Sequence, residues 1–340
     1  MTFNNSSTIP SIRLSLPSKG RLAEDSFRFL TDCGLHIDKP NERQYEARIP
    51  DLPEVLVLFQ RPADIVVSVR NGSVDFGISG LDVIEERKGE NDEILILHDD
   101  LHFGGCSLKL AVPENWSDVQ DCPSLKAYVQ KLKRPIRVAT KYPTLTTKFL
   151  KNWEIPNVLI SAEGTLETAP SIGYADMISD LVSSGQTLKD NRLRALPDGL
   201  ILKSQAAFIA NLESLKTKPA AQSVAHKLLE FFEAYLRASG NLAIFANMRA
   251  ESPEKLSQQI FEQTTIRGLQ GPTISRVYTR ELAPNWYAVN IIVHRDQIFS
   301  VVNELRAIGG SGVVVMPVTY IFEEEPPRYQ AMVKALKASL

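Results

Sequence analysis

The chain has 340 residues, of which 44% are hydrophobic and 23% are charged, the mix that is typical of folded globular proteins. This composition excludes a largely disordered chain, a collagen-like fibre and a bundle of membrane helices. The 38 Lys and Arg residues against 40 Asp and Glu leave a net charge of −2. We therefore expect neither nucleic acid nor a membrane as a partner, and any phosphate binding must come from local loops.

Three cysteines, at positions 33, 106 and 122, are widely spaced and form no CxxC motif. This pattern argues against a disulfide framework and a structural zinc site, and it favours a reducing cytoplasm. Residues 1–10 are polar and are expected to form a flexible tail. No apolar stretch approaches the roughly 20 residues that a membrane-spanning helix needs.

Short apolar runs alternate with helical patterns through most of the chain, which predicts an α/β fold with mainly parallel sheets. The first series of expected elements is strand 12–16, helix 22–30, strand 55–59, helix 65–69, strand 74–78 and helix 81–87. The second series is strand 107–112, strand 136–139, helix 144–153, strand 158–161, helix 165–172 and the strand-like run 175–182.

The two series share a short sequence similarity. Gly72-Ser73-Val74-Asp75 and Gly173-Tyr174-Ala175-Asp176 have the same spacing, and each is expected where a helix end enters a strand. One interpretation is the chance recurrence of a common turn, and the other is a pair of similar lobes with a cleft between them. Clefts between lobes are preferred ligand sites.

The last third of the chain has a different pattern. Helix 223–238 is strongly periodic and stops at Gly240. Ser252 and Pro253 are then placed as the N-cap and first residue of a helix. The strands expected here are 242–248, 287–293 and 313–322, with a second helix at 297–308 and a glycine-rich turn at 309–312. This order predicts a small ferredoxin-like α+β module that holds a small ligand or forms an interface.

The most informative stretch runs from Asp176 to Leu188. A strand with two acidic residues, Asp176 and Asp180, leads into a loop with hydroxyls at Ser183, Ser184 and Thr187 and a glycine at 185. Small residues let backbone N–H groups approach a phosphate, and the acids suit ribose hydroxyls or Mg²⁺. The segment matches neither a P-loop nor a GxGxxG turn, so an ordinary turn is the alternative interpretation.

Two other segments carry charges that suit a ligand site. Lys19, Gly20 and Arg21 follow the first strand, at the sheet edge where α/β proteins bind ligands, and two cations there fit an anion. Solvated surface charges are the alternative. Glu163 and Glu167 are four residues apart; either both face the cleft, or Glu167 only complements the dipole of a helix start.

Taken together, these segments resemble the ATP phosphoribosyltransferase of histidine biosynthesis, in its long form with a C-terminal regulatory domain. The resemblance spans roughly residues 12–322 and is carried by blocks in order along the chain: 16–22, 61–65, 72–80, 100–106, 139–143, 163–170, 173–188, 271–275 and 305–309. The departures are mild: Val66 where the family usually has Pro, Thr165-Leu166 for Ser-Val, and Ser184 for Thr.

The resemblance implies a fold similar to two-lobed periplasmic binding proteins, followed by the regulatory domain. The expected division is a tail at 1–10, lobe I at 11–105 plus about 200–240, lobe II at 106–199 and a regulatory domain at 241–340. It also implies condensation of ATP with phosphoribosyl pyrophosphate (PRPP), feedback inhibition by histidine, a homohexamer and Mg²⁺ held mainly by substrate phosphates rather than by a cage of side chains.

The site residues that the resemblance implies fall into four sets. They are Asp176, Asp180 and Glu163 for catalysis; Asp180, Ser183, Ser184, Gly185, Gln186, Thr187, Leu188, Gly164 and Glu167 for PRPP; Lys19, Gly20, Arg21, Asp75, Gly77 and Gly80 for ATP; and Thr273, Ser275, Gly310 and Ser311 for histidine.

Two rival functions remain at this stage. Prephenate dehydratase has a similar two-lobed fold and C-terminal module, but it needs no phosphate loop, so the 183–187 segment argues against it. The other is a non-catalytic regulatory paralogue or a small-molecule binding protein on the same fold. Intact Lys19, Arg21, Asp180 and Thr187 argue against that alternative.

Overall fold

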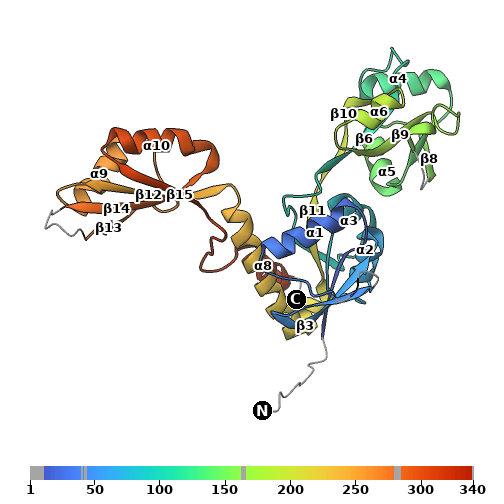
Figure 1. Ribbon diagram of the computed structural model, residues 1–340. Coiled ribbons are helices and arrows are strands. Elements are labelled where there is room, and N and C mark those ends of the chain that lie inside the picture. The colour runs from blue at the N-terminus through green and yellow to red at the C-terminus, as the bar shows by residue number, and fades with distance from the viewer. Residues whose placement is uncertain (1–10, 40, 42–43, 162–165, 279–284, 339–340) are drawn as a thin grey trace. The chain divides into compact units, whose positions relative to one another are not determined.

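The computed structural model describes residues 11–39, 41, 44–161, 166–278 and 285–338, and it divides into two compact units (Figure 1). Unit 1 comprises the chain up to Leu229 together with Pro327–Leu340, and unit 2 comprises Glu230–Pro326. The sequence assigned all of 241–340 to the regulatory module, whereas the last helix groups with unit 1. Among the described residues, no helix is long and apolar enough to cross a membrane.

Unit 1 contains two sheets, and each forms the centre of one lobe. The lobe I sheet has the order β2 (Glu46–Ile49), β3 (Leu52–Gln60), β1 (Ile12–Pro17), β4 (Phe76–Gly80), β11 (Ala206–Asn211) and β5 (Ile94–His98). Its helices are α1 (Arg21–Asp32), α2 (Pro62–Arg70), α3 (Leu81–Arg87), α7 (Leu212–Thr217), the first part of α8 (Pro219–Ala238) and α11 (Pro327–Ala338).

The lobe II sheet has the order β10 (Leu193–Ser204), β6 (Cys106–Pro113), β9 (Met177–Val182), β7 (Ile136–Thr140) and β8 (Asn157–Ser161). Its helices are α4 (Cys122–Leu132), α5 (Pro143–Asn152), α6 (Gln186–Asp190) and the single 3₁₀ turn η1 (Leu166–Thr168). A capping box explains where α4 begins. The Asp121 side chain accepts from the Ser124 amide, and the Ser124 hydroxyl accepts from the Asp121 amide.

The expectation of mainly parallel sheets is wrong. Strand β1 pairs in parallel with β3 and β4, but β11 is antiparallel to both β4 and β5, and β6 is antiparallel to β9 and β10. The reason is the path of the chain, which leaves lobe I after β5 and returns through β11. The helix expected at 165–172 is only the turn η1 in its described part.

The short sequence similarity between the two series corresponds to a similar structure in the two lobes. Arg13 at the start of β1 and Arg137 at the start of β7 each donate a backbone N–H to an aspartate, Asp75 and Asp176, at 2.8 Å. Each arginine side chain also donates to a backbone carbonyl in the turn before the neighbouring parallel strand: Arg13 to Ser73 before β4 at 3.1 Å, and Arg137 to Gly173 before β9 at 3.0 Å. Similar sequences therefore build the same junction between two parallel strands in each lobe, which favours the interpretation of two similar lobes over chance.

Two segments form the hinge that joins the lobes. The first crossing is 99–105, between β5 and β6, and the second is Gln205, between β10 and β11. The crossings are bonded to each other, because the Gln205 amide donates to the Asp99 carbonyl at 2.8 Å and the Leu101 N–H donates to the Ala206 carbonyl at 2.9 Å.

His98, the last residue of β5, is buried beside this hinge. Burial lowers the pKa of His98 to about 4, helped by the charges of Arg328 and His102 and opposed by Asp99 and Asp100. Because the unfolded chain then binds more protons than the folded one between pH 4 and pH 6.5, stability should fall as the pH falls through that window. The cost expected on going from pH 7.5 to pH 5 is about 2 kcal/mol.

The substitution His98→Gln should flatten this dependence, as measured by thermal unfolding across the pH range. His36→Gln is the control, because His36 is exposed. Equal pH dependence in wild type and His98→Gln would contradict the assignment.

Unit 2 has the order β12 (Asn241–Arg249), α9 (Pro253–Gln263), β13 (Thr273–Arg276), β14 (Trp286–His294), the turn η2 (Arg295–Gln297), α10 (Ile298–Ala307) and β15 (Ser311–Pro317). Ser252 caps α9 as predicted, by accepting from the Lys255 amide. Figure 1 shows both helices on one face of the sheet, where Leu256, Ile260 and Leu305 pack against alternate residues of β12 and β14. This β-α-β-β-α-β order is that of the ferredoxin-like motif. The last strand ends at Pro317, five residues earlier than expected.

The expected two-lobed α/β region followed by a C-terminal α+β domain is confirmed.

Candidate active site

The carboxyl end of β9 presents the predicted phosphate loop. Gly185 adopts a left-handed conformation with φ of 77°, and the Gln186 amide donates to the Ser184 hydroxyl at 3.3 Å. The side chains of Ser183, Ser184, Gln186 and Thr187 are exposed, whereas Leu188 is buried in the lobe II core. The loop therefore displays three hydroxyls at the sheet edge and is anchored from behind by Leu188.

Asp180 lies half-buried just before this loop. Burial raises the pKa of the Asp180 carboxyl and the charge of Glu167 raises it further, while a hydrogen bond from the Leu181 amide at 2.8 Å and the charge of Lys141 lower it. Asp180, Glu167 and Lys141 therefore lie within electrostatic reach of one another. Glu163 and Gly164, which the sequence assigned to the same cleft, lie outside the described residues.

Asp176 does not share this edge, which corrects its assignment to the ribose site. It precedes β9 and faces the opposite, amino-terminal edge of the sheet, where its carboxylate accepts from Arg134 at 2.6 Å and from Arg137 at 2.9 Å. Burial alone would raise the pKa of Asp176, but hydrogen bonds from both arginines outweigh it and hold the pKa well below its usual range. Asp176 is therefore a structural residue.

In lobe I, Lys19, Gly20 and Arg21 follow β1 and are exposed at the carboxyl edge of the sheet, where Gly80 ends β4. Gly20 has φ of 76°, and α1 begins directly after it. Arg21 is 85% exposed at its side chain and is 3.5 Å from Asp25 on the helix surface. These residues present two cations to solvent at the ligand-binding edge.

The other residues that the sequence assigned to ATP do not form part of this edge, apart from Gly80. Asp75 precedes β4 at the amino-terminal edge and is buried, and its carboxylate accepts from Lys218 at 2.6 Å. Gly77 is interior, because a Cβ there would lie 2.5 Å from the Ile65 side chain of α2. The glycine at 77 thus permits close packing of helix on strand rather than ligand contact.

Sequence reasoning missed a buried polar network beside the hinge. The Tyr142 hydroxyl donates to the Asp82 carboxylate at 2.6 Å, and the Ser204 hydroxyl donates to the same carboxylate at 2.5 Å. Asp82 comes from lobe I, Tyr142 from lobe II and Ser204 from the end of β10. The pKa of Tyr142 is raised strongly by burial and by the Asp82 charge. A signal was present, since Asp82 and Tyr142 each follow the carboxyl end of a strand.

A pocket of about 570 Å³ adjoins Tyr142. It is lined by α2 and α3 of lobe I and by Lys141, Tyr142, Pro143 and Ser161 of lobe II. Lys141 also acts on Asp180, so the pocket and the predicted PRPP edge share a residue. Glu86, in the same pocket, accepts from the amides of Thr144 and Leu145 and so caps α5.

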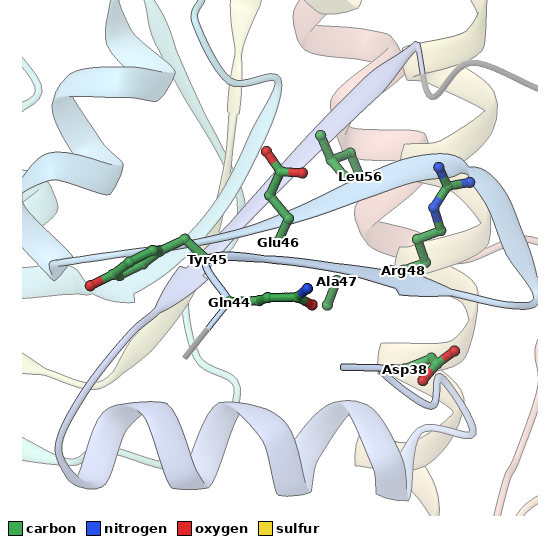
Figure 2. Close-up of a pocket in the computed structure, with 7 residues that line it drawn as sticks. All are labelled: Asp38, Gln44, Tyr45, Glu46, Ala47, Arg48 and Leu56. Atoms are coloured by element: carbon green, nitrogen blue, oxygen red, sulfur yellow. The ribbon is translucent and has the colours of Figure 1, made fainter. Parts of the chain in front are cut away.

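A second hollow, of about 430 Å³, lies at the β2–β3 edge of lobe I (Figure 2). Figure 2 shows the Tyr45 side chain on the far side of the hollow from Asp38 and Arg48. The hollow shares no residue with the predicted site.

The four residues assigned to histidine do not form one site within a chain. Thr273 and Ser275 lie on β13, whereas Ser311 lies on β15 and Gly310 directly precedes it. Strands β13 and β15 are the opposite edges of the sheet, with β14 and β12 between them. Three strand spacings separate the edges by roughly 14 Å, which is too far for one amino acid to touch both.

Two family models match the chain. The model described as ATP phosphoribosyltransferase matches residues 61–234, and the model described as HisG, C-terminal domain, matches residues 238–320. The chain belongs to the ATP phosphoribosyltransferase family. It has the long form with the HisG C-terminal domain, as the sequence predicted, and it is an ATP phosphoribosyltransferase that catalyses the first step of histidine biosynthesis.

Relatives of this family span almost the whole chain. ATP phosphoribosyltransferase 2, chloroplastic, of Arabidopsis thaliana is 45% identical over 333 residues, which cover 96% of this chain and 80% of the relative. ATP phosphoribosyltransferase of Methanosarcina barkeri is 35% identical over 312 residues, which cover 91% and 99%. Among solved structures, the HisG:HisZ complex of Thermotoga maritima matches with a TM-score of 0.50 and 25% identity, covering 65% of this chain and 98% of that chain.

Proposed function

We propose that the carboxyl edge of lobe II, with Asp180, Glu167 and the loop 183–187, binds PRPP, and that the lobe I edge with Lys19, Gly20, Arg21 and Gly80 binds ATP. The observation that carries this proposal is Asp180, held half-buried directly before a loop of exposed hydroxyls. Hydroxyls and amides suit the 5′-phosphate, and a carboxylate suits the ribose. Lys19 and Arg21 suit the triphosphate.

In the reaction, adenine N1 of ATP attacks the anomeric carbon of PRPP. The N1–C1 bond forms as the C1–O bond to pyrophosphate breaks, and that electron pair leaves with pyrophosphate, giving N1-(5-phosphoribosyl)-ATP with inversion at C1. The nucleophile is an unprotonated ring nitrogen, so no strong base is needed, and positioning supplies much of the rate.

Asp180 and Glu167 supply electrostatic stabilisation. Positive charge develops on the ribose in an oxocarbenium-like transition state, and two carboxylates in a partly desolvated place stabilise it more than water would. Burial disfavours the charged form of Asp180, whereas Lys141 favours it. Lys141 therefore helps to keep the carboxylate ionised for this role.

Mg²⁺ fits the donors at this edge, since Asp180 and Glu167 offer carboxylate oxygens, which Mg²⁺ prefers alongside substrate phosphates. When bound, it neutralises charge on the departing pyrophosphate. Among the described side chains, no group of three or more His, Cys, Asp or Glu residues is placed to hold a metal ion.

Histidine is the inhibitor that we assign to the unit 2 module. The candidate histidine contacts form two separate pairs, because they lie on different strands. One pair is Thr273 and Ser275, and the other is Gly310 and Ser311. A homohexamer is the expected assembly. The cytoplasmic location expected from the cysteines stays a prediction, since the Arabidopsis relatives are named as chloroplastic.

A direct assay tests the proposal. Purified protein is mixed with ATP, PRPP, Mg²⁺ and a pyrophosphatase, and the near-ultraviolet change on adenine N1 alkylation is followed with and without histidine. We expect product formation that histidine suppresses. Binding of both substrates without turnover would instead favour the non-catalytic paralogue, and turnover that histidine leaves unchanged would remove the regulatory part of the proposal.

A further inference from the structure

The C-terminal helix α11 packs on unit 1 rather than on the module that precedes it in sequence. Met332 and Leu336 are buried, and the helix contacts β5 and α7. The Tyr329 ring meets His226 of α8 edge-on, with centroids 4.5 Å apart. The helix, dark red in Figure 1, lies beyond residue 320, so it is outside both matched family models.

Its first turn reaches the hinge between the lobes. The Arg328 guanidinium is 2.6 Å from the Asp99 carboxylate, and Asp99 is the first residue of the first crossing. The carbonyl of the same Asp99 accepts from Gln205 in the second crossing. Arg328 therefore contacts one of the residues through which the two crossings are bonded to each other.

The same end of α11 is joined by the chain to the regulatory sheet. Nine residues, 318–326, connect the end of β15 to the start of α11. They are fixed along α8: the Ile321 amide donates to the Ala234 carbonyl at 3.0 Å, the rings of Tyr320 and Phe322 meet Phe231, and Glu323 pairs with Arg237. The segment 318–326 is therefore held in place by its contacts with α8.

We propose that α11 couples the regulatory module to the catalytic hinge, with Arg328 as a positioning residue that ties Asp99 to the C-terminal segment. The proposal rests on the histidine inhibition assigned above. Hinge rotation is one way in which two lobes close around a ligand, and an element bound to Asp99 biases such a rotation. A displacement of β15 reaches Asp99 through 318–326 and α11.

The test compares Arg328→Ala with Lys337→Ala, which removes the same charge from an exposed position on the same helix. The Arg328–Asp99 pair is about half exposed, with side chains 41% and 53% accessible, so its loss should leave the unfolding temperature nearly unchanged. We expect Arg328→Ala to keep the wild-type rate without histidine within about twofold. At saturating histidine, its residual rate should be about tenfold above that of wild type.

Lys337→Ala should behave as wild type, and the exchange Arg328→Asp with Asp99→Arg should restore full inhibition. Titration calorimetry with L-histidine should show that Arg328→Ala still binds the inhibitor. The proposal would be overturned if histidine inhibited Arg328→Ala fully. It would also be overturned if Lys337→Ala lost as much inhibition as Arg328→Ala. Wild type that neither binds histidine nor is inhibited would instead overturn the regulatory function on which the proposal rests.

Discussion

Replacement of Asp180 by Asn should lower kcat/KM for phosphoribosyl transfer by about 10²–10³-fold, or roughly 3–4 kcal/mol of transition-state stabilisation. The substitution keeps the shape of the side chain but removes the charge that, in the proposed mechanism, stabilises the developing oxocarbenium. Because Asp180 is half-buried, that charge is not replaced by bulk water. The measurement is steady-state kinetics in both substrates, and the loss should fall mainly on kcat.

The pH profile supplies a second readout for the same residue. Burial raises the pKa of Asp180 above the ordinary 3.8, so the acid limb of the wild-type rate profile should lie at a higher pH than a solvated aspartate would give. This limb should be absent in Asp180→Asn. Asp118→Asn is the control, since Asp118 is exposed and lies outside the phosphate loop. Wild-type turnover in Asp180→Asn would remove Asp180 from the catalytic machinery.

Asp176→Asn should destabilise the protein by about 3 kcal/mol, because it leaves Arg134 and Arg137 without their shared carboxylate. The Asp176 side chain is only 9% exposed, whereas the two arginines are 46% and 39% exposed, so the cost lies at the lower end for a buried pair. Urea unfolding followed by near-ultraviolet circular dichroism should show the loss.

The Asp176 carboxylate also makes the stability of the protein depend on pH. The pKa of Asp176 is lowered in the folded state, so its stabilising contribution is present above pH of about 4 and is lost as the pH falls below that value. The rate of Asp176→Asn, measured at a temperature where it is folded, should stay within a few-fold of wild type. A rate loss as large as that of Asp180→Asn, without a loss of stability, would restore Asp176 to the active site.

This contrast shows where sequence reasoning succeeded and where it failed. The family, the fold class, the helix 81–87 and the Ser252 cap follow from local patterns, and each is confirmed. The predicted strand 74–78 is β4 at 76–80, a shift of two residues. Asp75 thus lies before the strand at its amino-terminal edge, whereas the family resemblance had assigned it to ATP at the carboxyl edge.

The features that the sequence did not predict depend on contacts between distant residues. Tyr142 meets Asp82 from 60 positions away, and Arg328 meets Asp99 across most of the chain. A local pattern can place such a residue at a strand end, but it does not identify the distant partner. The predicted histidine contacts divide between two edges of the sheet for a related reason. The glycine-rich turn and the 273–275 segment each look suited to a small ligand, but their separation depends on strand order, which tertiary pairing sets.

The position of β11 also bears on how the protein is made. It lies between β4 and β5, yet it is synthesised after the whole of lobe II. A ribosome adding about 5–20 residues per second needs roughly 5–20 s for the intervening hundred residues. During that time lobe I lacks an interior strand, with the apolar edges of β4 and β5 unpaired, while lobe II already has all five of its strands by residue 204. Lobe II therefore has all its strands first, and the segment 12–98 of the nascent chain is the part that must wait longest for its missing strand.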